Sequence, residues 1–99
     1  MTPVIRHVVL FKLRPDAPAD EKEAWLDLAR TLPKEVDVLR SFSIGEDVKH
    51  GPRSYDVALV SDFDSSDDAQ VYAVHPAHVP VAQMGAALCS DIATVDFEL

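Results

Sequence analysis

The chain has 99 residues, the size of a single domain, and its 47% hydrophobic and 26% charged residues are ordinary for a globular protein. Nine Lys and Arg against seventeen Asp and Glu give a net charge of −8. This charge argues against nucleic-acid partners and anionic membranes, because both require a basic surface. The sequence has no apolar run long enough to span a bilayer, no secretory pattern and one cysteine, Cys89. We therefore expect one soluble domain over residues 1–99 in the reducing cytoplasm.

The first half of the chain predicts a strand, a helix and a second strand. Residues 4–13 form an apolar, β-branched run of strand length. Apolar residues at helical spacing then predict a helix that starts with a capping box at Asp20 and Glu23 and ends at Pro33. Residues 38–46 alternate in polarity, as a second strand does.

The second half of the chain predicts a third strand and an interrupted helical region. Residues 54–63 form another apolar run, and Ser65 is a predicted N-cap for a helix that continues to about Val74. Pro76 follows at once, and the residue before a proline avoids the helical region. We therefore expect the helix to be interrupted at His75.

Residues 79–88 predict a further short helical turn, and residues 90–98 a last strand. The resulting order within one domain is β-α-β-β-α-β. This order predicts an α+β, ferredoxin-like fold, in which two helices cover one face of an antiparallel four-stranded sheet.

The first strand is apolar on both of its faces. Ile5, Val9 and Phe11 point one way, whereas Val8 and Leu10 point the other way. A strand of this kind belongs to a sheet that is buried on both sides. Because two helices cover only one side, we expect a two-fold homodimer that buries the other side.

His7 falls on the same strand face as the apolar residues Ile5 and Val9. A histidine in such a position is most often packed into the core with its hydrogen bonds satisfied. The functional alternative is a polar group facing a ligand cavity, where imidazole exchanges a proton near neutral pH.

The segment from Tyr72 to Val79 carries the most chemistry in the chain. We expect His75, which precedes the proline, to bond local backbone. Tyr72 and His78 stand at either end of one bend, and a phenol and an imidazole placed in this way can converge on a cavity as an acid–base pair. The alternative is plain packing of the two rings.

Metal and nucleotide chemistry is not predicted. His75 and His78 lack the further ligands that a zinc site needs. The acidic run at residues 62–68 begins like a calcium loop but lacks the required glycine and final glutamate. No glycine-rich phosphate loop is present, and Cys89 has no motif around it. We expect neither a metal nor a cofactor.

Several of these segments together resemble the stress-responsive A/B barrel domain (Dabb) family. The similarity covers about residues 3–98 and depends most on the segment Tyr-Ala-Val-His-Pro-Ala-His-Val. The other matching positions are residues 5–13, Gly45, residues 55–60 and Phe63. The resemblance implies a dimeric α/β barrel in which two ferredoxin-like sheets face one another.

One branch of the family contains a plant polyketide cyclase that forms olivetolic acid. Its motif tyrosine and second histidine, which match Tyr72 and His78 here, serve acid–base roles in an aldol closure. The first-strand histidine of the cyclase matches His7. A further cavity histidine of that cyclase is matched by Val57 in this chain, and this departure weakens the case for the same substrate.

Three functional hypotheses follow. The first is a small-molecule cavity for an apolar or polyketide-like ligand, with Tyr72 and His78 as cofactor-free catalytic groups and His7 and His75 in contact with the ligand. The second is a non-catalytic dimer that protects under stress or binds a partner. The third is a cofactor-free monooxygenase. An open, polar-lined cavity of ~300 Å³ or more favours ligand chemistry over the structural alternative.

Overall fold

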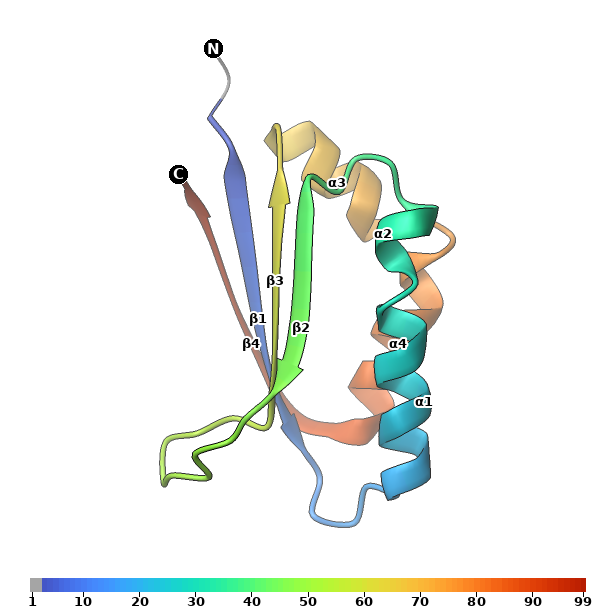
Figure 1. Ribbon diagram of the computed structural model, residues 1–99, viewed down its shortest axis with the longest axis vertical. Helices are drawn as coiled ribbons and strands as arrows, with labels where there is room; N and C mark the ends of the chain where they lie inside the picture. Colours follow the sequence, from blue (N-terminus) through green and yellow to red (C-terminus); the bar gives the residue numbers. More distant parts are fainter. Residues whose placement is uncertain (1–2) are drawn as a thin grey trace.

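The computed structural model describes residues 3–99 as a single antiparallel sheet with its helices on one face (Figure 1). Along the chain the elements are β1 (Ile5–Leu13), α1 (Ala19–Ala29), α2 (Leu32–Glu35), β2 (Ser41–Glu46), β3 (Val57–Phe63), α3 (Ser66–Ala73), α4 (His78–Leu88) and β4 (Cys89–Glu98). The strand order is β2-β3-β1-β4, with every neighbouring pair antiparallel. The predicted ferredoxin-like arrangement is confirmed.

The helix ends of the first crossover differ from the prediction. No capping box forms: Pro18 precedes α1 without a side-chain cap, and the Asp20 carboxylate accepts only the N–H of Glu21, at 3.0 Å. The helix ends at Ala29, and Pro33 lies in the first turn of α2. Proline suits that position because the first N–H groups of a helix have no partner within the helix. Pro33 therefore starts a short helix instead of ending the long one.

The second crossover confirms the predicted cap and break. Ser65 Oγ accepts the Asp68 N–H at 3.1 Å and caps α3, which ends at Ala73. The short helical turn predicted at residues 79–88 is instead an eleven-residue helix, α4, that begins at His78. Pro80 does not interrupt α4, because it lies in the first turn, where a helix tolerates proline.

Strand alternation sends the odd-numbered residues of β1 towards the helices. Phe11 packs edge-on against Trp25 of α1, with ring centroids 4.8 Å apart. The β1–β3 register places Val57, Leu59, Ser61 and Phe63 on this same side, and all four are buried. The two-sided apolar character predicted for β1 is confirmed.

Trp25 connects three elements of the core. Its ring is only 1% exposed, and its Nε1–H donates to the Val81 carbonyl of α4 at 3.1 Å. A Cβ added at Gly85 would lie 3.1 Å from the same ring. The approach of α4 to α1 is therefore so close that a side chain at position 85 would require the Trp25 ring to move by a few tenths of an ångström.

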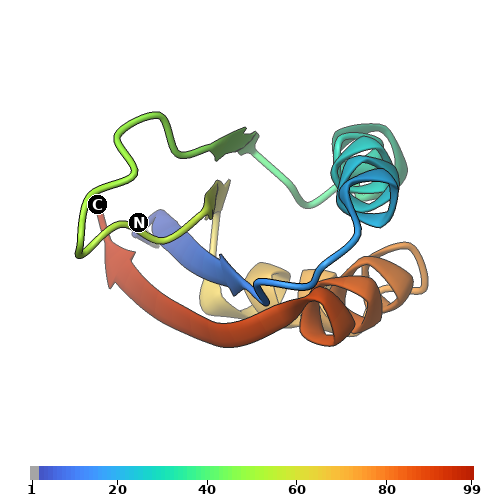
Figure 2. The ribbon, with the colours of Figure 1, turned by 90° about the horizontal axis from the view of Figure 1, so that it is seen from below.

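The opposite face of the sheet is apolar at its centre and polar at both ends. The apolar centre consists of Val8, Leu10, Ala58, Val60, Ala93 and Val95. Val95 is 61% exposed. At one end Arg6 donates two hydrogen bonds to Asp62, at 2.8 and 2.9 Å, and at the other Tyr55 donates to Asp91 at 2.6 Å. An apolar centre within a polar rim is typical of a protein interface. Of the segments within residues 3–99, the β2–β3 loop extends on this side of the sheet, away from the helices (Figure 2).

Val95→Asp should convert a sheet-to-sheet dimer into a monomer, because it would bury an unpaired charge at the centre of the interface. Sedimentation velocity measures the change in mass. Val71→Asp, on the exposed side of α3, is the matched control and should leave the mass unchanged. A Val95→Asp protein with the parent's mass would contradict an interface on this face.

Two serines should respond in opposite ways to replacement by alanine. Ser65→Ala removes a helix cap and should lower the free energy of unfolding by about 1 kcal/mol. Ser61 is fully buried, and its hydroxyl has no hydrogen-bond partner within residues 3–99. Ser61→Ala should therefore leave stability unchanged or raise it. Urea denaturation of both variants is the measurement, and a loss in Ser61→Ala equal to that in Ser65→Ala would show that Ser61 has a partner.

Candidate functional site

A cavity of about 530 Å³ lies between the sheet and α3, at the end where β1 begins and β3 and β4 end. The sheet contributes Ile5, His7 and Phe63 together with the last residues of β4. One side of α3 and His78 of α4 complete the wall. This volume is within the range of small-molecule sites and is larger than the ~300 Å³ that we set as the minimum for a ligand cavity.

The helical region is interrupted at His75 and Pro76, between the two helices that contribute to the cavity wall. Pro76 has no N–H and restricts the residue before it, so α3 cannot continue. The His75 ring accepts the Ala77 N–H on Nδ1 at 3.0 Å, and the His75 carbonyl accepts the His78 N–H at 2.9 Å. His75 thus bonds the local backbone at the start of α4, as predicted from its position before proline. Its side chain is not among those that line the cavity.

The break also places the predicted pair together. The ring centroids of Tyr72 and His78 lie 4.2 Å apart, and both residues line the cavity. His78 Nδ1 lies 3.0 Å from the Ala73 carbonyl oxygen. Because a carbonyl oxygen only accepts, Nδ1 carries the hydrogen, and Nε2 of the neutral ring is left with a free lone pair.

Burial controls the protonation of both rings. It lowers the pKa of His78 below the usual value of 6.5, although the hydrogen bond to the Ala73 carbonyl partly opposes this effect. Burial raises the pKa of Tyr72 to about 12. At neutral pH the pair therefore consists of an unprotonated imidazole and a protonated phenol. These are the forms that a general base and a hydrogen-bond donor require.

The Tyr72 hydroxyl is available to a ligand. The ring is only 3% exposed and packs against Phe63, with centroids 5.1 Å apart. Within residues 3–99 its hydroxyl makes no hydrogen bond with the protein, and Tyr72 belongs to the cavity wall. The hydroxyl oxygen is not among the fully buried polar atoms without a partner, so it keeps access to the cavity and a ligand oxygen can accept its hydrogen bond.

His7 approaches the pair from the sheet. Its ring centroid is 6.4 Å from that of Tyr72, and its Nδ1 is hydrogen-bonded to the carboxylate of Asp96. The two residues face each other directly in the β1–β4 register. A carboxylate accepts the Nδ1 hydrogen, which fixes the orientation of the ring and leaves Nε2 as its other polar atom.

The sequence did not identify Asp96. It lies in the last strand, and its meeting with His7 depends on the register between two strands almost ninety positions apart. Alternation along residues 90–98 could have grouped Asp96 with Thr94 and Glu98 on one face. Only the pairing with β1 shows that this face is the one that lines the cavity.

Among the described residues we also looked for a metal site, a membrane-spanning helix and a reactive cysteine. Within residues 3–99, no three His, Cys, Asp or Glu side chains are grouped closely enough to hold a metal ion. No helix in the same range is long and apolar enough to cross a membrane. Cys89 is partly buried, and burial raises the pKa of its thiol, which makes the thiol less reactive at neutral pH.

Comparison with known proteins identifies the family. Residues 5–99 match the Stress Responsive A/B Barrel Domain, abbreviated Dabb. The chain belongs to the Dabb family. An uncharacterised protein of Streptomyces coelicolor is 36% identical to this Dabb chain over 93 residues, which are 92% of each sequence. The resemblance noted in the sequence is thereby confirmed.

Solved structures similar to the Dabb chain agree in fold. A dimeric ferredoxin-like protein of unknown function from Bacteroides fragilis is 35% identical, with a TM-score of 0.84 over 97% of this chain and 96% of its own. A dimeric ferredoxin-like protein from Thermobifida fusca is 28% identical, with a TM-score of 0.90; the match covers 100% of this chain and 93% of that protein. The hydroxynitrile lyase of Passiflora edulis has a TM-score of 0.86, and the match covers 100% of this chain and 95% of the lyase. Because the two sequences are only 17% identical, this likeness concerns the fold alone.

Acid should destabilise the folded Dabb chain through His78. The unfolded imidazole titrates near 6.5 and the folded one lower, so the unfolded state binds more protons once the pH falls below that value. The free energy of unfolding should therefore fall as the pH drops through 6.5, until the folded pKa is passed. Urea denaturation between about pH 7.5 and 5.5 measures this slope.

His78→Gln should make the slope shallower, because glutamine does not titrate. His50→Asn removes a histidine of the exposed β2–β3 loop, outside the cavity, and is the comparison variant; asparagine tolerates the positive φ of 54° at that position. An unchanged slope in His78→Gln would mean that His78 is not buried in its neutral form.

Proposed function

We propose that this Dabb protein binds a small, mostly apolar molecule that carries a carbonyl group, and that it acts on this molecule by acid–base chemistry without a cofactor. The observation that carries the proposal is the pair of rings in the cavity. Tyr72 and His78 lie 4.2 Å apart, the first kept protonated and the second kept neutral by burial. Groups whose environments separate their proton affinities in this way are suited to act as acid and base.

The reaction that best fits this pair is removal of a proton from a carbon next to a carbonyl. His78 Nε2 accepts the proton, the electron pair of the C–H bond forms a C=C bond, and the π pair of the carbonyl moves onto its oxygen. Tyr72 donates a hydrogen bond to that developing oxyanion, a contribution worth several kcal/mol where one donor is decisive. The carbanion equivalent then attacks a second carbonyl of the same molecule in a ring closure, or is reprotonated.

His7 and Asp96 position the ligand in this scheme. The carboxylate of Asp96 holds the His7 ring through Nδ1, so that ring orients the polar end of a ligand rather than moving freely. Ile5, Phe63 and Ala73 supply apolar walls for the rest of the molecule. The arrangement suits a ligand with one polar end and an apolar body.

We also propose that the working unit is a homodimer formed through the open face of the sheet. The dimeric descriptions of the Bacteroides fragilis and Thermobifida fusca proteins support this assembly, as does the apolar centre of that face. The Passiflora edulis lyase supports the view that the fold can carry an enzyme.

Thermal unfolding with a panel of polyketide-like acids, aromatic carbonyl compounds and fatty acids tests the proposal. A ligand present at 100 times its dissociation constant adds about 2.7 kcal/mol. For a domain of this size the midpoint then rises by roughly 10 °C. Tyr72→Phe should lower the affinity for such a ligand about tenfold, because one hydrogen bond is lost.

Tyr72→Phe without ligand should unfold within about 0.5 kcal/mol of the parent, since its hydroxyl bonds no residue in the range 3–99. Tyr55→Phe is the matched control: its hydroxyl bonds Asp91 at the other end of the sheet, so ligand affinity should not change. No ligand shift, together with marked instability of Tyr72→Phe and His78→Ala, would indicate the non-catalytic, partner-binding alternative.

A further inference from the structure

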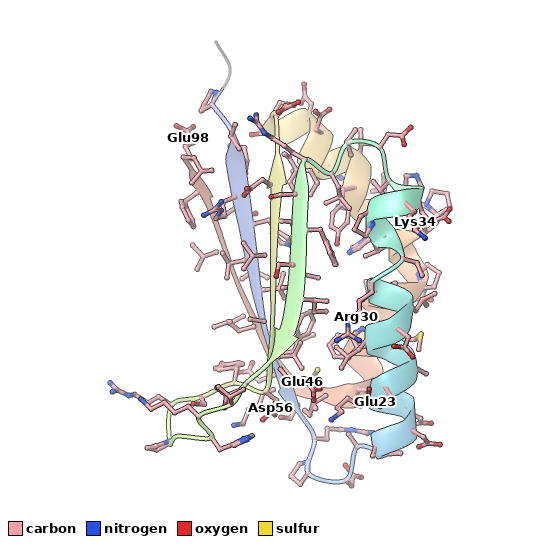
Figure 3. All side chains as sticks on the ribbon, viewed as in Figure 1. Glu23, Arg30, Lys34, Glu46, Asp56 and Glu98 are labelled. Carbon is pink, nitrogen blue, oxygen red and sulfur yellow. The ribbon has the colours of Figure 1, made fainter. Side chains whose placement is uncertain are left out.

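The cavity wall contains carboxylates but neither lysine nor arginine. Among the residues that line it, the ionisable ones are His7, Tyr72, His78, Asp96 and Glu98. The two carboxylates both come from the end of β4. Glu98 is exposed and has no ion-pair partner within residues 3–99. Figure 3 shows Glu98 at the end of the sheet where the cavity lies.

The sign of this charge does not depend on the protonation of His7. With a neutral His7 ring, Asp96 and Glu98 are both uncompensated. With a protonated ring, the bond between His7 and Asp96 becomes a neutral ion pair, and Glu98 still leaves the wall negative. His78 adds no positive charge at neutral pH because burial disfavours its protonated form.

Two arginines among residues 3–99 at this end of the sheet are already paired. Arg6 lies on the opposite face and binds Asp62, and Arg40 binds Asp64 at 2.9 Å. The N-terminus of α3 also faces this region through Ser66, but acidic residues in its first turn oppose its positive end.

We propose that this cavity selects an uncharged carbonyl compound and rejects the corresponding carboxylate. The inference rests on the proposed function and narrows its ligand class. Neutral donors and acceptors, namely the Tyr72 hydroxyl and the imidazole nitrogens, satisfy a ketone, aldehyde or ester oxygen. A carboxylate would instead lose part of its hydration, gain no cationic partner and lie beside like charges.

Two pairs of nearly isosteric compounds test the selection. One pair is 4-phenyl-2-butanone with 3-phenylpropanoate, and the other is 2-undecanone with decanoate. The members of each pair differ mainly in a methyl group replaced by a charged oxygen. Isothermal titration of the full-length parent at about pH 7.5, where both acids are ionised, should show the ketone binding at least ~10-fold more tightly in each pair.

Glu98→Gln separates charge from shape. It should strengthen binding of the carboxylates several-fold and leave the ketones unchanged, because it removes one negative charge at constant size. Glu23→Gln makes the same change on α1 at the opposite end of the molecule (Figure 3) and should alter neither affinity. Added salt should reduce the preference of the parent for ketones, since screening weakens repulsion at the cavity mouth.

The possible outcomes distinguish the two proposals. Carboxylates that bind as tightly as their ketones would overturn the charge selection and leave the proposed ligand cavity intact. Equal effects of Glu98→Gln and Glu23→Gln on the carboxylates would overturn the assignment of the selection to the cavity wall. Failure of all four compounds to bind would contradict the proposed carbonyl-binding function, and this inference with it.

Discussion

The interruption of the helical region at Pro76 is the constraint on which the candidate site depends. In a continuous helix, Tyr72 and His78 would be residues of one straight segment, and the backbone groups of His75 would form hydrogen bonds within that helix. Because proline stops the helix, the ring and the carbonyl of His75 instead accept the N–H groups of Ala77 and His78, where the next helix begins. The bend turns His78 back onto Tyr72, and the Ala73 carbonyl selects the tautomer of its ring. One backbone restriction thus sets both the position and the chemistry of the pair.

The rest of the core supports that bend from the side. Trp25 holds α4 against α1 through the Val81 carbonyl and through contact with Gly85, and it also packs on Phe11 of the sheet. The helices are therefore fixed to one face of the sheet, and the cavity remains at the end where this packing stops. The other face keeps an exposed apolar centre, which supports the proposed homodimer.

Burial and charge give the cavity a specific character. Desolvation keeps the phenol protonated and the imidazole neutral, so the polar groups at its centre act through hydrogen bonds rather than through charge. The fixed charges of its wall, from the end of β4, are negative. Both properties support the proposed neutral ligand with a polar end and the proposed acid–base chemistry.

The sequence by itself determined what local rules control: the order of the strands and helices, the two apolar faces of β1, the Ser65 cap and the convergence of Tyr72 with His78 across Pro76. Each of these depends on neighbouring residues and on backbone restrictions that act over a few positions. The tertiary structure alone decided the pairing of His7 with Asp96, the place of Glu98 at the cavity and the absence of His75 from its wall. It also decided that Pro33 begins a helix and that α4 runs for eleven residues. These features depend on strand register and on helix packing, in which residues far apart in the chain meet, and no local pattern specifies such meetings.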